Sequence, residues 1–317
     1  MKTRLLLILA VVALCAVGFF LNSYQADIYR KLLLWTALGL GFNFLFGISG
    51  QVAFSHFTFY GIGAYWIVIA VFQWDIPLPI AALSGIVLAS ILALALAIPS
   101  TRLEGPYLAL ATLALAQLFH LGVVSGREFT GGDTGLGGYR LPAIFGFTVT
   151  GPWYTACLVL LCAFTYLCLD RLDRSWFGRA CRAIRDNQAA AQAMGINVPL
   201  TKVIAFTVTS VLASIAGFFY AFVDNLVAPG AFSLDNMFIL LFMIIVGGSG
   251  RQLGAIIGVL VLYSAPFFIE PLIGHFHLMA FGALVVALVV FRPKGLVSLF
   301  DAMFRRERAP TGAGRQS

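Results

Sequence analysis

Long apolar runs without a single charged residue constrain this chain more than any other feature of its sequence. A soluble helix needs a polar face toward water, and these runs have none. The chain is 61% hydrophobic and only 10% charged, whereas soluble domains carry about 25% charged residues. Lipid must therefore surround most of the side chains, and no soluble fold can accommodate the sequence.

The runs predict helices. In hydrocarbon every backbone N–H and C=O must be paired, which leaves helices or a closed barrel, and the runs lack the polar alternation of barrel strands. We predict an all-α, polytopic transmembrane helical bundle of about ten spans with a cytoplasmic coupling helix. The predicted spans are Leu5–Leu21, Leu32–Phe46, Val52–Phe72, Leu78–Ile98, Tyr107–Val124, Trp153–Leu169, Val203–Val223, Asn236–Val246, Gly254–Phe268 and Leu278–Phe291.

Two of these spans are short for a hydrocarbon core of about 30 Å, namely Leu32–Phe46 and Asn236–Val246. We expect them to extend outward or to be broken helices. The first span follows Lys2 and Arg4, as in a signal peptide. Because many spans follow it, we interpret it as an uncleaved first span.

The basic residues predict the orientation of the spans. If the chain starts in the cytoplasm and the spans alternate, the inside loops are 47–51, 99–106, 170–202 and 247–253, together with both termini. Of the 20 Lys and Arg residues, 16 then lie inside, and only Arg30, Lys31, Arg127 and Arg140 lie outside. The positive-inside rule expects such a distribution. We therefore predict a multi-pass protein of the cell inner membrane whose basic loops face anionic lipid and not nucleic acid.

The predicted spans contain no Lys, Arg, Asp or Glu. Carriers driven by protons or sodium need such groups within the membrane, and the chain also lacks a Walker A phosphate loop. We predict that this chain is not an enzyme, that it holds no cofactor or metal, and that any ATP is hydrolysed by another polypeptide. We interpret His120 as a core histidine, and the five cysteines as apolar packing residues.

The segment 170–202 is longer than a connection between two spans needs. Its sequence predicts an amphipathic helix from Phe177 to about Met194, with Gly195 as its stop. Such a helix can lie on anionic lipid or dock a cytoplasmic partner. We expect Phe177, Ala180, Cys181, Ile184 and Ala191 on its inner side, opposite Arg179, Arg182 and Asp186.

A glycine step, Gly47–Gln51, separates two predicted spans and is similar to Gly247–Gln252. The first step is either a plain cytoplasmic turn or a mid-membrane helix break whose backbone lines the solute path. The candidate path residues are Gly47, Gly50, Gln51, Ser55, His56, Thr112 and Gln117.

Two further patterns concern the loops and the helix contacts. On the outside face, the glycine-rich stretch Thr130–Gly138 is either a receptor for a binding protein or a flexible connector. The pairs Gly254 with Gly258 and Ala213 with Gly217 predict close helix packing.

The segment Phe177–Ile196 resembles the cytoplasmic loop of the branched-chain amino acid ABC transporter permease family. The resemblance covers roughly residues 32–300 and departs from the family's pattern at Asn187 and Gln188, which follow Asp186 where acidic residues are common. Further similar segments, in the same order, are Gly47–Gln51, Ser55–His56, Gly61–Tyr65, Tyr107–Leu113, Thr130–Leu136, Gly247–Gly250 and Phe291–Leu296.

The resemblance implies a single permease domain, 1–300, followed by a polar basic tail, 301–317. It implies import of a small amino acid, in the first place a branched-chain one. The alternative that it leaves open is import of urea or another small amide. The implied partners are a second permease subunit in a heterodimer, two ATPase subunits that carry ATP and Mg, and a periplasmic solute-binding protein. The implied ATPase-coupling residues are Phe177, Gly178, Arg179, Arg182, Ile184, Arg185, Asp186, Ala191 and Gly195.

Overall fold

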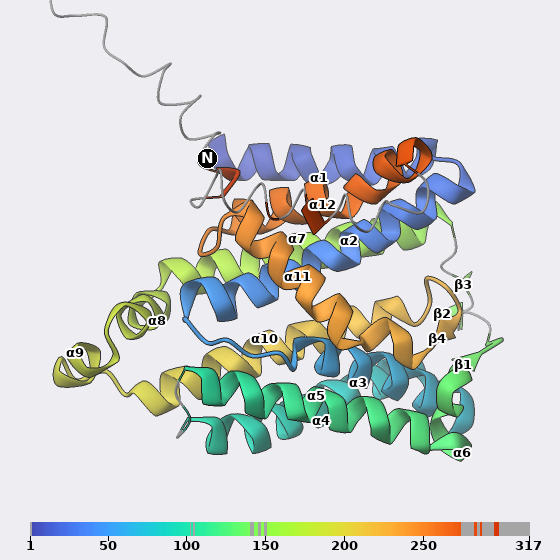
Figure 1. Ribbon diagram of the computed structural model, residues 1–317. Helices are drawn as coiled ribbons and strands as arrows, with labels where there is room; N and C mark the ends of the chain where they lie inside the picture. Colours follow the sequence, from blue (N-terminus) through green and yellow to red (C-terminus); the bar gives the residue numbers. More distant parts are fainter. Residues whose placement is uncertain are drawn as a thin grey trace, which may run out of the picture.

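A computed structural model describes residues 2–101, 103, 105–139, 143–144, 147–148 and 151–273, and also 282–283, 286 and 295–297. Over these residues the protein is a bundle of long helices that run roughly side by side (Figure 1). The strands among the described residues are only two residues long. The prediction of an all-α polytopic bundle is therefore confirmed.

In the described part of the chain eight helices build the bundle, each at least 18 residues long once a π-helical continuation is counted, because each long apolar run satisfies its own backbone groups in helical form. Two of them continue into short π-helices, η1 (Phe44–Ile48) after α2 and η2 (Ile69–Gln73) after α3. The long helices are α1 (Lys2–Phe20), α2 (Ser23–Asn43), α3 (His56–Val68), α4 (Leu78–Ser100), α5 (Pro106–Ser125), α7 (Pro152–Arg174), α10 (Val198–Tyr220) and α12 (Gln252–Ile273).

Shorter elements connect the long helices. Strand β1 pairs with β4, and β2 pairs with β3, both antiparallel. The shorter elements are α6 (Arg127–Thr130), η3 (Gly132–Thr134), β1 (Leu136–Gly137), β2 (Ala143–Ile144), β3 (Phe147–Thr148), α8 (Trp176–Asp186), α9 (Gln188–Ala193), β4 (Leu226–Val227), η4 (Pro229–Phe232) and α11 (Leu234–Gly247).

Six helices of the described chain are long and apolar enough to cross a membrane, or up to seven spans if a bent pair counts as one. The bent pair is α11 and α12, which meet at 119°. The first of the ten predicted spans falls on α1. The last predicted span, Leu278–Phe291, and the predicted tail 301–317 lie outside the described residues apart from isolated positions.

The two short predicted spans have different outcomes. The span predicted as Leu32–Phe46 extends outward, because α2 and η1 together form a 26-residue span from Ser23 to Ile48. The span predicted as Asn236–Val246 belongs to the 14-residue helix α11. That helix covers about 21 Å at 1.5 Å per residue, which is too short for the hydrocarbon core, and it is the first arm of the bent pair.

The loops predicted to share one side of the membrane lie at one end of the bundle. We call this end, at the left of Figure 1, the α8 end; it holds α8, α9, the segment 49–55, the turn between α4 and α5, and the turn between α11 and α12. The N-terminal end of α1 lies there too. The opposite end, which holds α6, β1 and β4, is called the β1 end.

Helices α2, α3 and α10 form the centre of the bundle, and α4 and α5 lie outside them. The α2 span is 72% buried within the protein, whereas α5 is 22% buried. Glycines permit the tightest contacts: a Cβ at Gly63 would lie 2.0 Å from the Ser214 carbonyl oxygen, and one at Gly217 would lie 2.0 Å from that of Tyr60. Gly258 packs in the same way against Met243. The predicted packing role of Gly217 and Gly258 is therefore confirmed.

Candidate coupling junction and translocation path

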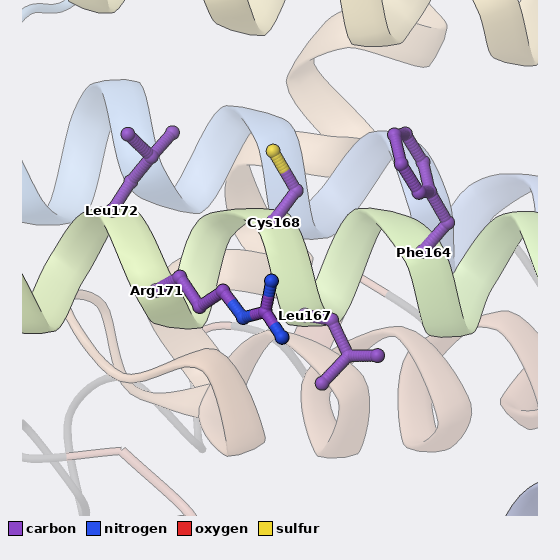
Figure 2. Close-up of a pocket in the computed structure, with 5 residues that line it drawn as sticks. All are labelled: Phe164, Leu167, Cys168, Arg171 and Leu172. Carbon is purple, nitrogen blue, oxygen red and sulfur yellow. The ribbon is translucent and has the colours of Figure 1, made fainter.

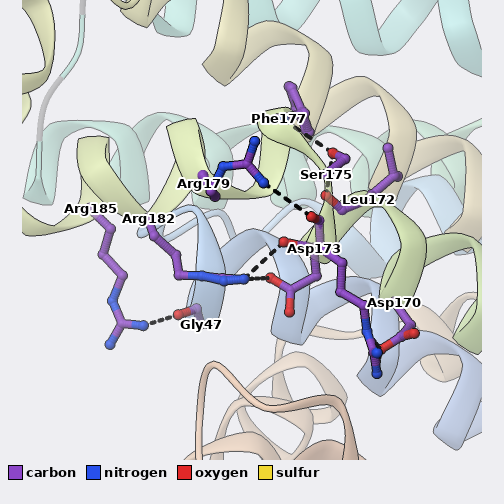
Figure 3. Close-up of polar contacts among 10 residues, drawn as sticks. Gly47, Asp170, Leu172, Asp173, Ser175, Phe177, Arg179, Arg182 and Arg185 are labelled. Carbon is purple, nitrogen blue, oxygen red and sulfur yellow. Dashed lines mark hydrogen bonds and ion pairs between the residues drawn. The ribbon is translucent and has the colours of Figure 1, made fainter. Parts of the chain in front are cut away.

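Helix α8 leaves the α8 end of the bundle directly after α7. Ser175 has extended backbone and its hydroxyl accepts a hydrogen bond from the Phe177 N–H at 3.1 Å, which satisfies one of the free donors at the start of the helix. Figure 3 shows this cap beside the basic side chains of α8. The cap separates α8 from α7 and turns the new helix away from the membrane span.

The amphipathic segment forms two helices and not the single helix predicted from Phe177 to Met194. The break is at Asn187, whose backbone is extended and whose side-chain oxygen accepts from the Ala190 N–H at 3.0 Å. Asparagine favours such a capping position over a helix interior, so α8 ends and α9 begins there. Gly195 has φ +82°, and it ends α9 as predicted.

The predicted inner and outer faces of α8 are largely as the sequence indicates. Gly178, Ala180, Cys181, Ile184 and Ala191 are buried, whereas Arg179 and Asp186 are exposed. Phe177 is half-buried and its ring stacks on Phe44 of η1, with centroids 6.3 Å apart. The inner face of α8 therefore packs against the end of the α2 span.

Arg182 differs from the prediction, because it does not simply face solvent. Its guanidinium donates to the Asp173 carboxylate at 2.6 Å and to the Asp173 carbonyl at 2.8 Å (Figure 3). Asp173 belongs to the last turn of α7. One guanidinium nitrogen thus makes two charge-assisted hydrogen bonds to the same residue, so Arg182 joins α8 to the end of α7.

Arg185 joins α8 to the first glycine step. Its guanidinium donates to the Gly47 carbonyl oxygen (Figure 3). Gly50 lies against the aliphatic part of the same side chain, where an added Cβ would be 2.8 Å from the Arg185 Cγ. Gly50 also has φ +71°, a conformation that glycine adopts without the cost of a Cβ.

The two glycine steps meet each other beside Arg185. A Cβ at Gly47 would lie 2.2 Å from the Gly250 nitrogen, and a Cβ at Gly250 would lie 3.0 Å from the Arg185 Nη1. Leu296 donates from its N–H to the Val246 carbonyl at 2.8 Å, next to Gly295. We call this meeting point of Gly47, Gly250 and Arg185 the coupling junction.

The sequence interpretation missed Asn43, which holds the two steps together. Asn43 is fully buried in α2, and its side-chain oxygen accepts from the Gly250 N–H at 2.9 Å. The available signal was an amide side chain inside an otherwise apolar run. A buried polar side chain needs a partner, so its position pointed to a contact with another segment.

The Gly47–Gln51 step combines features of both predicted alternatives. The chain turns there, and α2 and α3 are separate candidate spans. The following segment returns into the bundle without helical structure, and α3 begins only at His56. The His56 Nε2 lies 3.2 Å from the Leu38 carbonyl oxygen, which is about three helical turns, or roughly 15 Å, from the end of η1.

The candidate path residues fall into separate groups along this returning segment. Gln51 lies at the α8 end, where its amide donates to Ser49 at 2.7 Å and to the Lys202 carbonyl at 3.3 Å. Ser55 and His56 are also buried, and the Ser55 Oγ and the His56 Nδ1 have no hydrogen-bond partner among the described residues. The Thr112 hydroxyl of α5 accepts a hydrogen bond from the Phe54 N–H at 3.0 Å, so Thr112 contacts the same segment.

Gln117 does not join this group. It is exposed, whereas Thr112 on the same helix is buried. Five residues along a helix correspond to a rotation of about 140°, so the two side chains lie on different faces of α5. The role of Gln117 stays a prediction that this placement does not support.

An open cavity of about 430 Å³ lies on α7 and contains none of the candidate path residues. Figure 2 shows its lining side chains along one stretch of that helix: Phe164, Leu167, Cys168, Arg171 and Leu172. The lining is almost entirely apolar, which is the surface that a helix presents to lipid or to another apolar helix. No group of three or more His, Cys, Asp or Glu that could hold a metal is present among the described residues.

The glycine-rich stretch Thr130–Gly138 is anchored at the β1 end. Leu136 and Gly137 pair with Val227 and Leu226, and the Gly138 N–H donates to the Asn225 carbonyl at 3.3 Å. A Cβ at Gly135 would lie 2.2 Å from the Val227 carbonyl oxygen. This close packing disfavours the interpretation of this stretch as a flexible connector.

Comparison with known proteins identifies the family. The model of the family described as branched-chain amino acid transport system, permease component, matches residues 24–291. The high-affinity branched-chain amino acid transport system permease protein LivM of Escherichia coli is 26% identical over 94% of this chain and 76% of its own length. A probable branched-chain amino acid transport permease protein LivM of Methanocaldococcus jannaschii is 29% identical over 67% of each chain.

A relative with another transport role is also similar. The autoinducer 2 import system permease protein LsrC of Klebsiella pneumoniae is 33% identical over 50% of this chain and 48% of its own length. No solved structure matches this chain.

Proposed function

This chain belongs to the family of permease components of branched-chain amino acid transport systems, and we propose that it is the membrane subunit of an ATP-driven importer of a small branched-chain amino acid. A periplasmic binding protein delivers the solute in this proposal. A second permease subunit completes the path as a heterodimer. Two cytoplasmic ATPase subunits bind ATP and Mg, so this chain catalyses no reaction itself.

The observation that carries the proposal is the convergence of separate sequence segments on the coupling junction. The glycine steps around Gly47 and Gly250, the helix α8 and the segment at Gly295 come from distant parts of the chain. Gly47, Gly250 and Arg185 of α8 contact one another at the α8 end, and Gly295 packs against Gly247 and Gly248 beside them. Such convergence is expected where a movement outside the membrane must reach several spans at once.

Helices α8 and α9 also present the surface that a partner needs. Trp176 is 65% exposed and Met194 is 83% exposed, although both are large apolar side chains. Arg179, Asp186 and Asn187 are exposed beside them. Aromatic residues, Met and Arg are enriched in protein interfaces, so we assign this surface to the ATPase.

The proposed coupling follows from the contacts of the two arginines. Arg182 ties α8 to α7, and Arg185 ties α8 to the Gly47 carbonyl. A push on α8 by the ATPase therefore moves the ends of α7, η1 and the 248–251 turn together. The returning segment 49–55 starts at this point, so its position in the bundle changes with that of α8.

The returning segment forms the proposed solute path in this chain. Backbone outside a helix is tolerated at membrane depth where it is buried in protein or lines a cavity. The Ser55 Oγ and the His56 Nδ1 are buried polar atoms that find no hydrogen-bond partner within the described part of the chain. We propose that a passing solute meets these atoms, with Gly50 and Gln51 nearer the cytoplasm and Thr112 on the opposite wall.

The orientation follows from the same arrangement. We place the α8 end in the cytoplasm of a cell whose inner membrane holds the protein, with both termini on that side. The β1 end, including the anchored Thr130–Gly138 stretch, then faces the periplasm and receives the binding protein. The concentration of basic residues around α8 agrees with the positive-inside rule.

The solute has one specific alternative. A relative named for import of autoinducer 2 matches half of this chain, so related permeases serve solutes other than amino acids. The second candidate is a permease for another small polar solute, such as urea or a related amide. A secondary carrier is a weaker third candidate, because the described spans hold their charged groups only near their ends.

The test of the proposed function is uptake by the assembled transporter. The chain is reconstituted into liposomes with its second permease subunit and its ATPase, and uptake of radioactive L-leucine is measured with the binding protein outside. We expect uptake that requires internal ATP and stops when the ATPase is omitted. Leucine uptake driven by an ion gradient without any ATPase would contradict the proposal.

The coupling role of α8 and α9 has a separate test. We expect deletion of residues 178–195 to abolish co-purification of the ATPase, with the Trp176→Ala and Met194→Ala variants weakening it. The matched control is Tyr24→Ala, which removes an exposed side chain at the β1 end. ATPase that still co-purifies with the deleted chain would remove the coupling hypothesis.

A further inference from the structure

A small cavity lined by aromatic side chains and one pair of opposite charges lies at the β1 end, away from the coupling junction. It has a volume of about 160 Å³ and is bounded by α2, by α3 and by the chain that follows α10. That volume equals roughly five water molecules in the liquid, which suits a small solute. The lining residues that matter for recognition are Lys31, Trp35, Phe57, Tyr60, Tyr220 and Asp224.

The cavity holds one positive and one negative side chain. The Lys31 Nζ of α2 lies 3.0 Å from the Asp224 Oδ1, and the two side chains are 38% and 34% exposed. A partly exposed pair of this kind contributes little to stability. Opening the ion pair so that each side chain can contact a ligand therefore costs little free energy.

The neighbouring charges are already used in structural contacts. Arg30 pairs with Asp27 at 2.8 Å and also donates to the Thr155 hydroxyl and the Gly151 carbonyl, both at 3.1 Å. These contacts join α2 to the start of α7. Neither Asp27 nor Arg30 lines the cavity, so the cavity keeps a single pair of opposite charges.

Apart from Asn236, the remaining walls are aromatic and apolar. Tyr60 and Tyr220 have ring centroids 5.2 Å apart, and Trp35 and Phe57 have centroids 5.4 Å apart. Leu34 is buried beneath them with 1% exposure. Aromatic faces accept both an aliphatic side chain and an ammonium group.

We propose that this cavity binds a zwitterionic, apolar amino acid on its way into the membrane, with the carboxylate on Lys31 and the ammonium on Asp224. The ion pair opens as the amino acid enters, and each charge gains the opposite charge of the ligand. The aliphatic side chain packs on the aromatic rings. This inference rests on the proposed function and adds a site of recognition within the permease itself.

The site gives this chain a chemical selectivity that the uncharged path lacks. A solute with only one of the two charges makes only one of the two charge-assisted contacts with Lys31 and Asp224, and so binds more weakly than a zwitterion. Amino acids are therefore favoured over amides and over carboxylic acids of the same size.

The experiment uses the full chain in nanodiscs and L-photo-leucine, a leucine with a photoreactive diazirine in its side chain. After irradiation, mass spectrometry identifies the labelled peptides. We expect labelling of the α2 and α3 peptides that contain Trp35, Phe57 or Tyr60, and protection by excess L-leucine. We expect L-leucinamide and 4-methylpentanoate, which each lack one charge, to protect about tenfold less well or worse.

Variants of Lys31 and Asp224 test which charged group of the ligand each side chain binds. We expect Lys31→Gln and Asp224→Asn each to reduce labelling by about tenfold, and Asp224→Asn also to remove the preference for L-leucine over 4-methylpentanoate. The matched control Asp27→Asn removes a carboxylate one turn from Lys31 but outside the cavity, and its labelling should equal that of the unaltered chain. The competition series with the unaltered chain tests the proposal even if a variant fails to fold.

The outcomes separate this proposal from the proposed function. Labelling elsewhere in the chain, or equal protection by leucine, its amide and its acid, would overturn the cavity as an amino acid site. ATP-dependent leucine uptake could still persist in that case. Conversely, specific labelling of the cavity in a chain that never supports ATP-dependent uptake would overturn the importer and retain the site.

Discussion

The coupling junction depends on single residues, because the backbones at Gly47 and Gly250 approach each other more closely than residues with a Cβ would allow. Gly47 and Gly250 lie in contact, and Asn43 and Arg185 provide the polar groups that hold them there. The Gly250 N–H and the Gly47 carbonyl are backbone groups at the ends of broken helices, where no helical partner is available. The two side chains supply the missing partners.

At this scale we predict that Gly47→Ala destabilises the protein. The added Cβ would lie 2.2 Å from the Gly250 nitrogen and 2.6 Å from the Asn43 Oδ1, so the junction must open. We expect a loss of about 1–3 kcal/mol in the free energy of unfolding, measured as a lower thermal unfolding midpoint in detergent. Gly122→Ala is the control, because its Cβ meets nothing within 4 Å, and an equal loss there would contradict the explanation.

The Arg185→Gln variant tests transmission through the junction. A contact from a charged donor contributes about 1.5–3 kcal/mol, so we expect ATP-dependent uptake to fall by about tenfold while ATPase binding persists. The control is Arg174→Gln, which removes an exposed pair with Asp170 at 3.0 Å and should change uptake little. Unchanged uptake in Arg185→Gln would show that force does not pass through this contact.

The difference between Arg185 and Asn43 shows what sequence can predict at the residue scale. Arg185 was predicted as a coupling residue from the resemblance of its whole segment. Asn43 lies in a run that is otherwise apolar, and its partner is Gly250, more than two hundred residues away. No local pattern encodes a contact at such a separation, so the contact required the three-dimensional structure.

At the scale of elements, helix α9 depends on its own cap. Asn187 supplies the only side-chain cap described at the start of that six-residue helix, and so short a helix is marginal alone. We expect Asn187→Ala to cost about 1 kcal/mol. Amide exchange of residues 188–193 should then be about fivefold faster. Gln192→Ala, an exposed change within α9, is the control, and equal rates in both variants would contradict the capping role.

The apolar runs predicted where the helices lie more accurately than where they end. The helices that break or stop early show why. Each run supplies enough apolar surface to form a buried helix, so the central spans follow directly from composition. Where a helix stops depends on groups such as Asn187 and Gly195, and on packing against distant segments. The returning segment 49–55 is an example, because Thr112 of α5 satisfies the Phe54 N–H that helical structure would otherwise satisfy.

At the scale of the whole molecule, charge placement and helix directions agree. The sequence predicted that the loops around 47–51, 170–202 and 247–253 share one side, and in Figure 1 they lie together at the α8 end. The cavity at Lys31 and Asp224 and the coupling junction then divide the molecule by function, with recognition proposed at the β1 end and coupling at the α8 end. A cytoplasmic α8 end remains the central expectation of this arrangement.

A membrane-impermeant maleimide tests that expectation with one cysteine at each end. Met194→Cys places a thiol at the α8 end, where the residue is 83% exposed, and Tyr24→Cys places one at the β1 end, where it is 71% exposed. We expect Met194→Cys to react only in inside-out vesicles and Tyr24→Cys only in right-side-out vesicles. The opposite pattern would reverse the orientation, and reaction of both from one side would contradict the arrangement of the ends.

The natural thiol nearest to Met194 should not interfere with this measurement. Burial, and to a smaller extent the charge of Asp173, raise the pKa of the Cys181 thiol to about 12, so almost no reactive thiolate forms at neutral pH. The unaltered chain, with all five natural cysteines, measures the remaining background. If mass spectrometry finds Cys181 of the unaltered chain labelled from the cytoplasmic side as strongly as Met194→Cys, Cys181 is accessible and the packing of α8 against α7 and η1 is wrong.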